Sequence, residues 1–171
     1  HLKERLGDDV RIIRKNAARS ITKILSPGES LKLFKDALKE NSQDVRSAAI
    51  TGLGELNIAD STAIIGLLIK SLSDQSPAVR SSAARSLGFF DSEGETAVPH
   101  LMKLLKDPDS SVRILSVSSL EKIAGRGDYL NELINAVKFL AKSDTDRYVK
   151  NAARDVLVKL NRRKKRFRKN P

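Results

Sequence analysis

Hydrophobic residues recur along this chain with the spacing of amphipathic helices, and a longer motif repeats the pattern five times. The clearest copy begins at Val79 and continues with Arg80, Ala83, Ala84 and Leu87. The other copies begin at Ile13, Val45, Val112 and Val149. Successive copies are therefore separated by 32, 34, 33 and 37 residues. A period in the thirties is that of one helical hairpin in an α-solenoid, so the sequence predicts an all-α solenoid of about five hairpins.

Within each copy, four positions form the apolar face of the second helix of the hairpin. They stand 0, 4, 8 and 11 residues after the starting residue, and these offsets fall within about 80° of arc on an α-helix. The residue at offset four is small in every copy, which predicts a close approach between helices. Offset four holds Ala17, Ala49, Ala83, Ser116 and Ala153; offset eight holds Ile21, Leu53, Leu87, Leu120 and Leu157; offset eleven holds Ile24, Leu56, Phe90, Ile123 and Leu160.

Turn residues and the apolar spacing together predict where the helices begin and end. A capping box from Ser26 to Glu29 marks one helix start, and side chains three residues before four of the starting residues are expected to cap the second helices. These capping residues are Ser42, Ser76, Asp109 and Asp146. The predicted helices span 9–25, 31–39, 43–56, 62–72, 77–90, 97–106, 109–124, 129–142 and 146 to about 163.

We expect the hairpins to form one right-handed superhelix over residues 1–160, followed by a basic C-terminal tail over residues 161–171. The expected repeat units span about 1–25, 26–57, 58–91, 92–125 and 126–160. Leu2 to Leu6 resembles the end of a helix that begins upstream. The chain is therefore expected to be a fragment of, or a module within, a longer solenoid.

An acidic and a basic residue bracket the turn between the two helices in every copy. The acid stands five residues before the starting residue and the base one residue after it. The acids are Asp8, Glu40, Asp74, Asp107 and Asp144, and the bases are Arg14, Arg46, Arg80, Arg113 and Lys150. We predict a structural ladder, in which each base pairs with an acid of its own or of the adjoining repeat. The alternative is that the bases contact a ligand directly.

The recurring Asp, Val-Arg, Ala-Ala and Leu-Gly pattern resembles HEAT repeats, especially the short kind first noted in phycobilisome lyases. The resemblance covers residues 2–160, but only Gly54 and Gly88 supply the glycine after the leucine, where Thr22, Glu121 and Val158 stand in the other copies. It implies an α-solenoid fold and a binding scaffold. A lyase activity is implied by the family name alone.

Composition limits the classes of chemistry open to the chain. It contains no cysteine, which excludes disulfides and cysteine-ligated metals. Its only histidines are His1 and His100, and no His-Glu pair occurs of the kind that binds iron in the HEAT-repeat deoxyhypusine hydroxylases. We therefore expect no catalytic residues, no cofactor and no metal site.

The chain also contains no apolar run of the roughly 18 residues needed to cross a bilayer, and no signal peptide is visible. No membrane association is therefore expected. We expect an intracellular, cytoplasmic location, with the nucleus as the alternative in a eukaryote.

The concave face of a solenoid is lined by the second helices and is the usual binding surface. Offsets 2, 6 and 10 point toward that face, away from the apolar face of the same helix. Phe89 is apolar where solvent is expected, so it either anchors a partner or folds back into the neighbouring repeat. The leading prediction is a scaffold or adaptor that binds a protein partner through Lys15, Arg19, Lys23, Thr51, Ser81, Arg85, Phe89, Ser118, Lys122 and Lys159.

Positive charge is concentrated at the end of the chain. The net charge is +11, and residues 161–171 hold seven bases and no acid, which leaves +4 for the rest. The tail bases are Arg162, Arg163, Lys164, Lys165, Arg166, Arg168 and Lys169. They could bind nucleic acid together with Lys15, Arg19, Lys23, Arg85 and Lys122, with Phe167 stacking on a base; this is the alternative function. The tail could equally be a nuclear import signal, a contact for an acidic partner, a solvated disordered segment, or an extension of the last helix.

Overall fold

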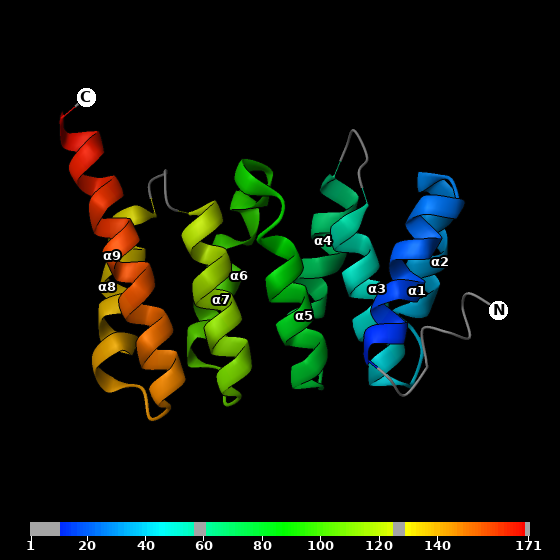
Figure 1. The fold of residues 1–171 in the computed structure, drawn as a ribbon, viewed down its shortest axis with the longest axis horizontal. Helices are drawn as coiled ribbons and strands as arrows, with labels where there is room; N and C mark the ends of the chain where they lie inside the picture. Colours follow the sequence, from blue (N-terminus) through cyan, green and yellow to red (C-terminus); the bar gives the residue numbers. More distant parts are fainter. Residues whose placement is uncertain (1–10, 57–60, 125–128, 170–171) are drawn as a thin grey trace. The chain divides into compact units, whose positions relative to one another are not determined.

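The computed structural model describes residues 11–56, 61–124 and 129–169, and all regular structure within these ranges is helical (Figure 1). The fold is an all-α solenoid of helical hairpins, as predicted. It divides into two compact units that meet between Leu87 and Gly88. This boundary falls near the end of the predicted 58–91 repeat.

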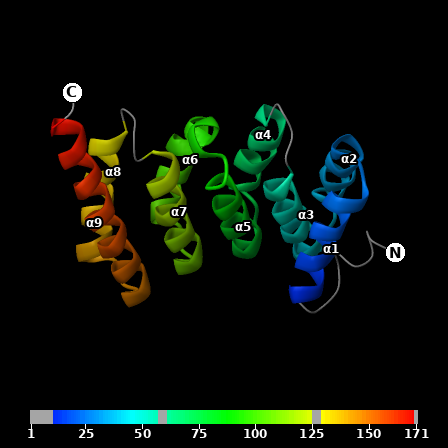
Figure 2. The same cartoon turned by 45° about the horizontal axis from the view of Figure 1, so that its top comes forward.

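The first unit contains α1 (Arg11–Ile24), α2 (Pro27–Ala37), α3 (Gln43–Glu55), α4 (Thr62–Ser71) and α5 (Pro77–Leu87). The pairs α2–α3 and α4–α5 are hairpins, and the second helices α1, α3 and α5 pack side by side (Figures 1 and 2). Helix α2 begins four residues earlier than predicted. The cause is the capping box, since Ser26 Oγ accepts a hydrogen bond from the Glu29 backbone N–H and Glu29 Oε2 accepts one from the Ser26 N–H.

The second unit contains α6 (Val98–Lys103), α7 (Ser110–Ile123), α8 (Leu130–Ser143) and α9 (Arg147–Lys169). Short 3-10 helices precede and follow α6, over Asp91–Ala97 and Leu104–Lys106. The first of these lies between the helices predicted over 77–90 and 97–106. Helix α9 packs against both α7 and α8.

The predicted apolar face is the core of both units. Offset four is buried in all five copies, and the offset-eight residues Ile21, Leu53, Leu87 and Leu120 are fully buried. The prediction is wrong at Ile24, the last residue of α1, which is 67% exposed. Leu157 is only half-buried.

Two glycines bring helices of the first unit into close contact. A Cβ atom on Gly52 would lie 2.2 Å from Cζ of the buried Phe34, and one on Gly54 would lie 2.6 Å from Ser86 Oγ. In the second unit, Gly88 makes the same contact with Ser119. The glycine after the leucine therefore admits a serine of the following second helix.

Ser116, the small residue at offset four of its copy, allows the cost of an unpaired buried hydroxyl to be tested. Its side chain is fully buried, and its Oγ is the one buried side-chain polar atom without a hydrogen-bond partner in the described part of the chain. The Ser116→Ala variant is expected to raise the free energy of unfolding by about 1 kcal/mol, because an unpaired buried hydroxyl is removed. Urea denaturation measures this change.

The matched control for that prediction is Ser86→Ala. Ser86 is also a buried serine within a second helix, but its Oγ donates a hydrogen bond to the Ile50 carbonyl oxygen at 3.2 Å. Both variants share the small gain in helix propensity from serine to alanine. Equal stabilisation of the two variants would mean that the unpaired hydroxyl has no measurable cost.

The last helix continues past the predicted domain boundary at residue 160. Helix α9 runs without interruption to Lys169, so the backbone of residues 161–169 is helical. Of the alternatives for the tail, the helical extension is therefore confirmed over these residues, and a disordered tail is wrong for them.

Candidate binding surface

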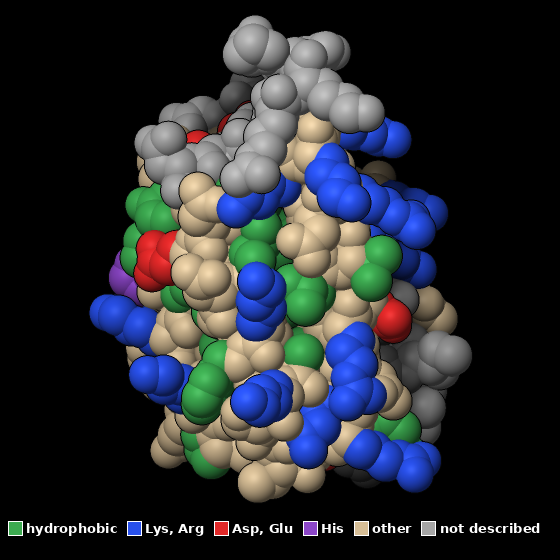
Figure 3. Space-filling model, turned by 90° about the vertical axis from the view of Figure 1, so that its left-hand side faces the viewer, with side chains coloured by type: hydrophobic (Ala, Val, Ile, Leu, Met, Phe, Trp, Pro, Cys, Tyr) green, Lys and Arg blue, Asp and Glu red, His purple; other side chains and the backbone are tan. Residues whose placement is uncertain are grey.

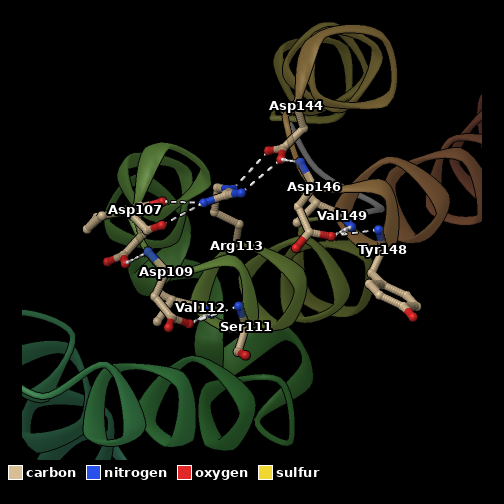
Figure 4. Close-up of polar contacts among 10 residues, drawn as sticks. Asp107, Asp109, Ser111, Val112, Arg113, Asp144, Asp146, Tyr148 and Val149 are labelled. Atoms are coloured by element: carbon tan, nitrogen blue, oxygen red, sulfur yellow. Dashed lines mark hydrogen bonds and ion pairs between the residues drawn. The ribbon is translucent and has the colours of Figure 1, made fainter.

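The predicted ladder forms between successive repeats in each unit. In the second unit, Arg113 Nε donates to Asp144 Oδ2 and Nη2 donates to Asp144 Oδ1, both at 2.8 Å (Figure 4). The remaining nitrogen, Nη1, donates to the carbonyl oxygens of Asp107 and Pro108 in the turn of its own repeat. Arg113 therefore connects the turn of its own repeat to that of the next.

The first unit repeats this geometry with Arg46. Its Nε and Nη2 donate to the two carboxylate oxygens of Asp74 at 2.8 and 2.9 Å, and Nη1 donates to the carbonyl oxygens of Glu40 and Asn41. Arg46 and Arg113 are both buried, with side chains 9% and 11% exposed. Direct ligand contact through these two arginines is therefore excluded by their burial.

The ladder changes the acid–base properties of its members. Burial raises the pKa of Asp144, but hydrogen bonds from Arg113 and from the Asp146 N–H outweigh it, so the pKa of Asp144 lies below its ordinary value. Asp74 behaves in the same way through Arg46 and the Ser76 N–H. The hydrogen bonds to these carboxylates raise the pKa of both arginines.

The other ladder residues are placed less uniformly. Arg80 Nη1 donates to the carbonyl oxygens of Asp74 and Gln75, and Lys150 is half-buried near Asp144, whose pKa its charge helps to lower. The side chain of Arg14, and all of Asp8, lie outside the described residues.

Two of the four predicted helix caps form as expected. Asp109 Oδ1 accepts hydrogen bonds from the N–H groups of Ser111 and Val112, and Asp146 Oδ1 accepts from those of Tyr148 and Val149 (Figure 4). The prediction is wrong for the side chain of Ser42, which makes no capping hydrogen bond. Ser76 Oγ donates to Gln43 Oε1 at 2.5 Å, so this hydroxyl forms a contact between two repeats.

The side chains at offsets 2, 6 and 10 form what we call the second-helix face of each unit. In the first unit, Arg19 on α1 and Glu55 on α3 form an ion pair, with Nε 2.9 Å from Oε1. The hydroxyls of Thr51 and Ser81 donate to carbonyl oxygens of their own helices. Lys23 and Arg85 are exposed, and the side chain of Lys15 is outside the described residues.

In the second unit, Phe89 stands at offset 10 of its copy, in the turn that follows α5. Phe89 is 54% exposed, so the alternative in which it folds back into a neighbouring repeat is wrong. Lys122 Nζ lies 5.1 Å from the centre of its ring, within the range of a cation–π contact. Ser118, one helical turn before Lys122, is half-buried.

Comparison with known proteins identifies the repeat. The family model of HEAT repeats matches residues 65–158, which is more than half of the chain. The chain belongs to the HEAT-repeat family. No curated protein matches it at a significant level.

Solved structures of low sequence identity share the HEAT-type fold. A chain from the complex of CpcE and CpcF of phycocyanin lyase from Nostoc sp. PCC7120 superposes with a TM-score of 0.76, at 17% identity, over 91% of this chain and 95% of that chain. A designed armadillo repeat protein in complex with the peptide (KR)4 gives 0.61, at 19% identity, over 93% and 80%. AlkD2 from Streptococcus mutans gives 0.55, at 20% identity, over 89% and 76%. At these identities the likeness establishes the fold alone.

The last HEAT repeat contains a contact that sequence reasoning missed. Glu121 on α7 is buried, and its carboxylate accepts from Arg163 and lies 3.5 Å from Lys159 Nζ. Arg163 also donates to the Glu121 carbonyl oxygen, and Lys164 Nζ donates to Asn131 Oδ1 at 2.7 Å. The sequence feature that could have indicated this contact is Glu121 itself, because it places a carboxylate at a position where two other repeats have glycine.

The predicted tail bases therefore divide into two groups. Arg163 and Lys164 attach the end of α9 to neighbouring helices, whereas Arg162, Lys165 and Arg166 are exposed. The side chains of Phe167, Arg168 and Lys169 lie outside the described residues.

Within the described residues, no three His, Cys, Asp or Glu side chains are grouped so as to hold a metal ion. No helix in the same ranges is both long and apolar enough to cross a membrane. His100 is exposed near the start of α6.

Proposed function

We propose that this chain is a non-enzymatic HEAT-repeat scaffold that binds a protein partner along the second-helix face. The observation that carries the proposal is the exposure of Phe89 on that face beside Lys122. A large aromatic side chain with a cation held against its ring supplies both apolar contact area and charge. Such residues are common anchors of protein interfaces.

The rest of the face suits a peptide or a protein loop. Lys122 offers a hydrogen-bond donor beside the aromatic ring, and Ser118 offers another one helical turn earlier on α7. Backbone groups of an extended peptide need such partners. One similar structure, the designed armadillo repeat protein, was solved in complex with a peptide. This supports, for the present chain, a binding mode in which a peptide lies across the second helices.

Two of the bases expected to bind nucleic acid on this face already have partners within the chain. Arg19 pairs with Glu55, and Lys122 lies against Phe89. Binding phosphates with these side chains would require them to leave those contacts. The second-helix face therefore favours a protein partner over the nucleic acid considered from the sequence.

Peptide selection followed by calorimetry tests the proposal. Peptides selected from a random library on the intact chain are titrated into wild type and the Phe89→Ala variant. Loss of an anchoring aromatic residue is expected to weaken binding about thirtyfold, which corresponds to about 2 kcal/mol. Lys122→Ala is expected to have a smaller effect in the same direction.

Phe139→Ala is the matched control for that measurement. Phe139 is 67% exposed but lies on α8, a first helix, so it is a phenylalanine of similar exposure away from the proposed face. Selected peptides that bind Phe89→Ala as tightly as wild type, or that lose affinity only with Phe139→Ala, would refute the assignment to the second-helix face.

A further inference from the structure

The hairpin formed by α8 and α9 carries most of the positive charge of the chain. Residues 129–171 contain thirteen Lys and Arg against four Asp and Glu, which gives +9 of the total +11. Two of the four acids are already used, since Asp144 is bound by Arg113 and Asp146 caps α9. The excess charge of this hairpin is therefore largely uncompensated.

Comparison of equivalent positions shows that α9 differs from the other second helices. Five residues after the starting residue, the first four repeats have an apolar side chain that is fully buried. These side chains are Ala18, Ile50, Ala84 and Val117. The last repeat has Arg154 at this position, and it is exposed. Nine residues after the starting residue, where Gly54 and Gly88 admit a serine of the following helix, α9 has Val158, which is 50% exposed.

Exposed bases follow one side of α9. Arg147, Arg154 and Lys165 are separated by 7 and 11 residues, spacings that place side chains on the same face of an α-helix. The 18 residues from first to last correspond to roughly 27 Å of helix. We call this side, with Val158, the outward face of α9. Figure 3 views the side of the second unit that carries α8 and α9, and Lys and Arg clearly outnumber Asp and Glu there.

The bases of the outward face are not neutralised by acids. Arg154 Nη1 donates to the amide oxygen of Asn151 at 3.2 Å, and the Arg147 guanidinium lies 4.9 Å from the centre of the Tyr148 ring. Within the described ranges, no carboxylate forms an ion pair with Arg147, Arg154 or Lys165. Their charges therefore remain available to an external anion.

Nucleic acid fits this surface better than the other occupants. A further hairpin of the same type would bury Arg154 where the inner repeats bury an apolar residue, and an unpaired buried charge is costly. A membrane surface would call for an apolar side along the same helix, but Val158 is the only apolar member of the row. The regularly spaced phosphates of a nucleic acid match a straight row of basic side chains, and arginine binds phosphate in a bidentate manner.

We propose that the outward face of α9 binds the phosphate backbone of a nucleic acid. Tyr148, which is 62% exposed beside Arg147, provides a ring on which an unpaired base can stack. This surface is separate from the second-helix face assigned to a protein partner. Its test is independent of that proposal.

Fluorescence anisotropy on the full chain tests the proposal with labelled DNA of about 20 nucleotides, single-stranded and as a duplex. The Arg154→Glu/Lys165→Glu variant is expected to bind both at least about tenfold more weakly at about 0.1 M salt. Loss of two phosphate contacts is also expected to reduce the slope of log K against log salt by about 1.5. The Arg154→Gln/Lys165→Gln variant gives the same direction with less change in charge, should the glutamate variant fail to fold.

The matched control is Lys32→Glu/Lys35→Glu. It makes the same change in net charge on exposed bases of α2 in the first unit, which belong to neither proposed surface, and it is expected to alter affinity less than about threefold. Tyr148→Ala distinguishes the two forms of the ligand, because loss of stacking is expected to weaken the single strand about fivefold and to spare the duplex.

Three results would overturn the proposal. If the control variant lost as much affinity as the test variant, only the net charge of the chain would matter. If polyglutamate of matched length bound as tightly as the oligonucleotide, the surface would recognise acidic protein segments rather than nucleic acid. Absence of binding to either form of DNA at about 0.1 M salt would show that the row does not act on phosphates at all.

Discussion

Replacing Arg113 with alanine is expected to lower the free energy of unfolding by about 3 kcal/mol. The substitution removes both hydrogen bonds to Asp144 and both hydrogen bonds to the carbonyl oxygens of Asp107 and Pro108. Asp144, which is 7% exposed at its side chain, is then left as a buried carboxylate without its cation. Chemical denaturation at neutral pH measures the loss.

The pH dependence of this loss separates the ion pair from simple packing. The pKa of Asp144 is lowered in the folded chain, so the pair stabilises the fold above the ordinary aspartate pKa of about 3.9. That contribution is lost as pH falls through the lowered pKa. The difference between wild type and Arg113→Ala is therefore expected to be large at neutral pH and to narrow below about pH 4.

Two further variants act as controls for the Arg113 prediction. Arg154→Ala removes an exposed arginine of the second unit and is expected to change stability by less than about 0.5 kcal/mol. The Arg113→Ala/Asp144→Ala double variant is expected to be less destabilised than the sum of the two single changes, because neither charge is then left alone. A loss that stayed constant from neutral to acid pH, with additive single effects, would contradict the ion-pair explanation.

The ladder also shows why the fold was largely predictable from the sequence. An acid and a base at fixed offsets predicted the pairing, and Arg46 with Asp74 and Arg113 with Asp144 confirm it. The choice of the following repeat as partner was not predictable, because it depends on how far successive hairpins are displaced from one another. Helix packing determines that displacement, and no single repeat encodes it.

The candidate surfaces were less predictable for the same reason. The offset pattern left open whether Phe89 is exposed or folds back into a neighbouring repeat, and the structure shows it exposed. The pattern also did not identify Lys122 as its neighbour, which is 33 residues away in the sequence. The contact between Glu121 and Arg163 likewise joins residues of two repeats. From the sequence, Arg163 was one member of a uniform basic run. In the structure it differs from the exposed bases of that run, because it binds Glu121 of α7.

The second large effect is expected at Gly52. The Gly52→Ala variant should lower the free energy of unfolding by about 2 kcal/mol, because an added Cβ would lie 2.2 Å from Phe34 Cζ and 2.6 Å from both Cε atoms. Phe34 is fully buried, so moving its ring is expected to disturb the packing of the core around it. Overpacking should therefore outweigh the gain of up to about 1 kcal/mol that alanine gives over glycine inside a helix.

Gly66→Ala isolates that helix-propensity gain. Gly66 lies within α4, and nothing lies within 4 Å of a Cβ placed on it, so this variant is expected to be more stable than wild type by up to about 1 kcal/mol. In the Gly52→Ala/Phe34→Leu variant, a smaller side chain replaces the ring and leaves space for the new methyl group. Part of the lost free energy of unfolding should therefore be recovered. If Gly52→Ala were stabilised as much as Gly66→Ala, the close approach of Phe34 to α3 would be wrong. If the leucine variant showed no recovery, the added methyl group would be clashing with something other than the ring.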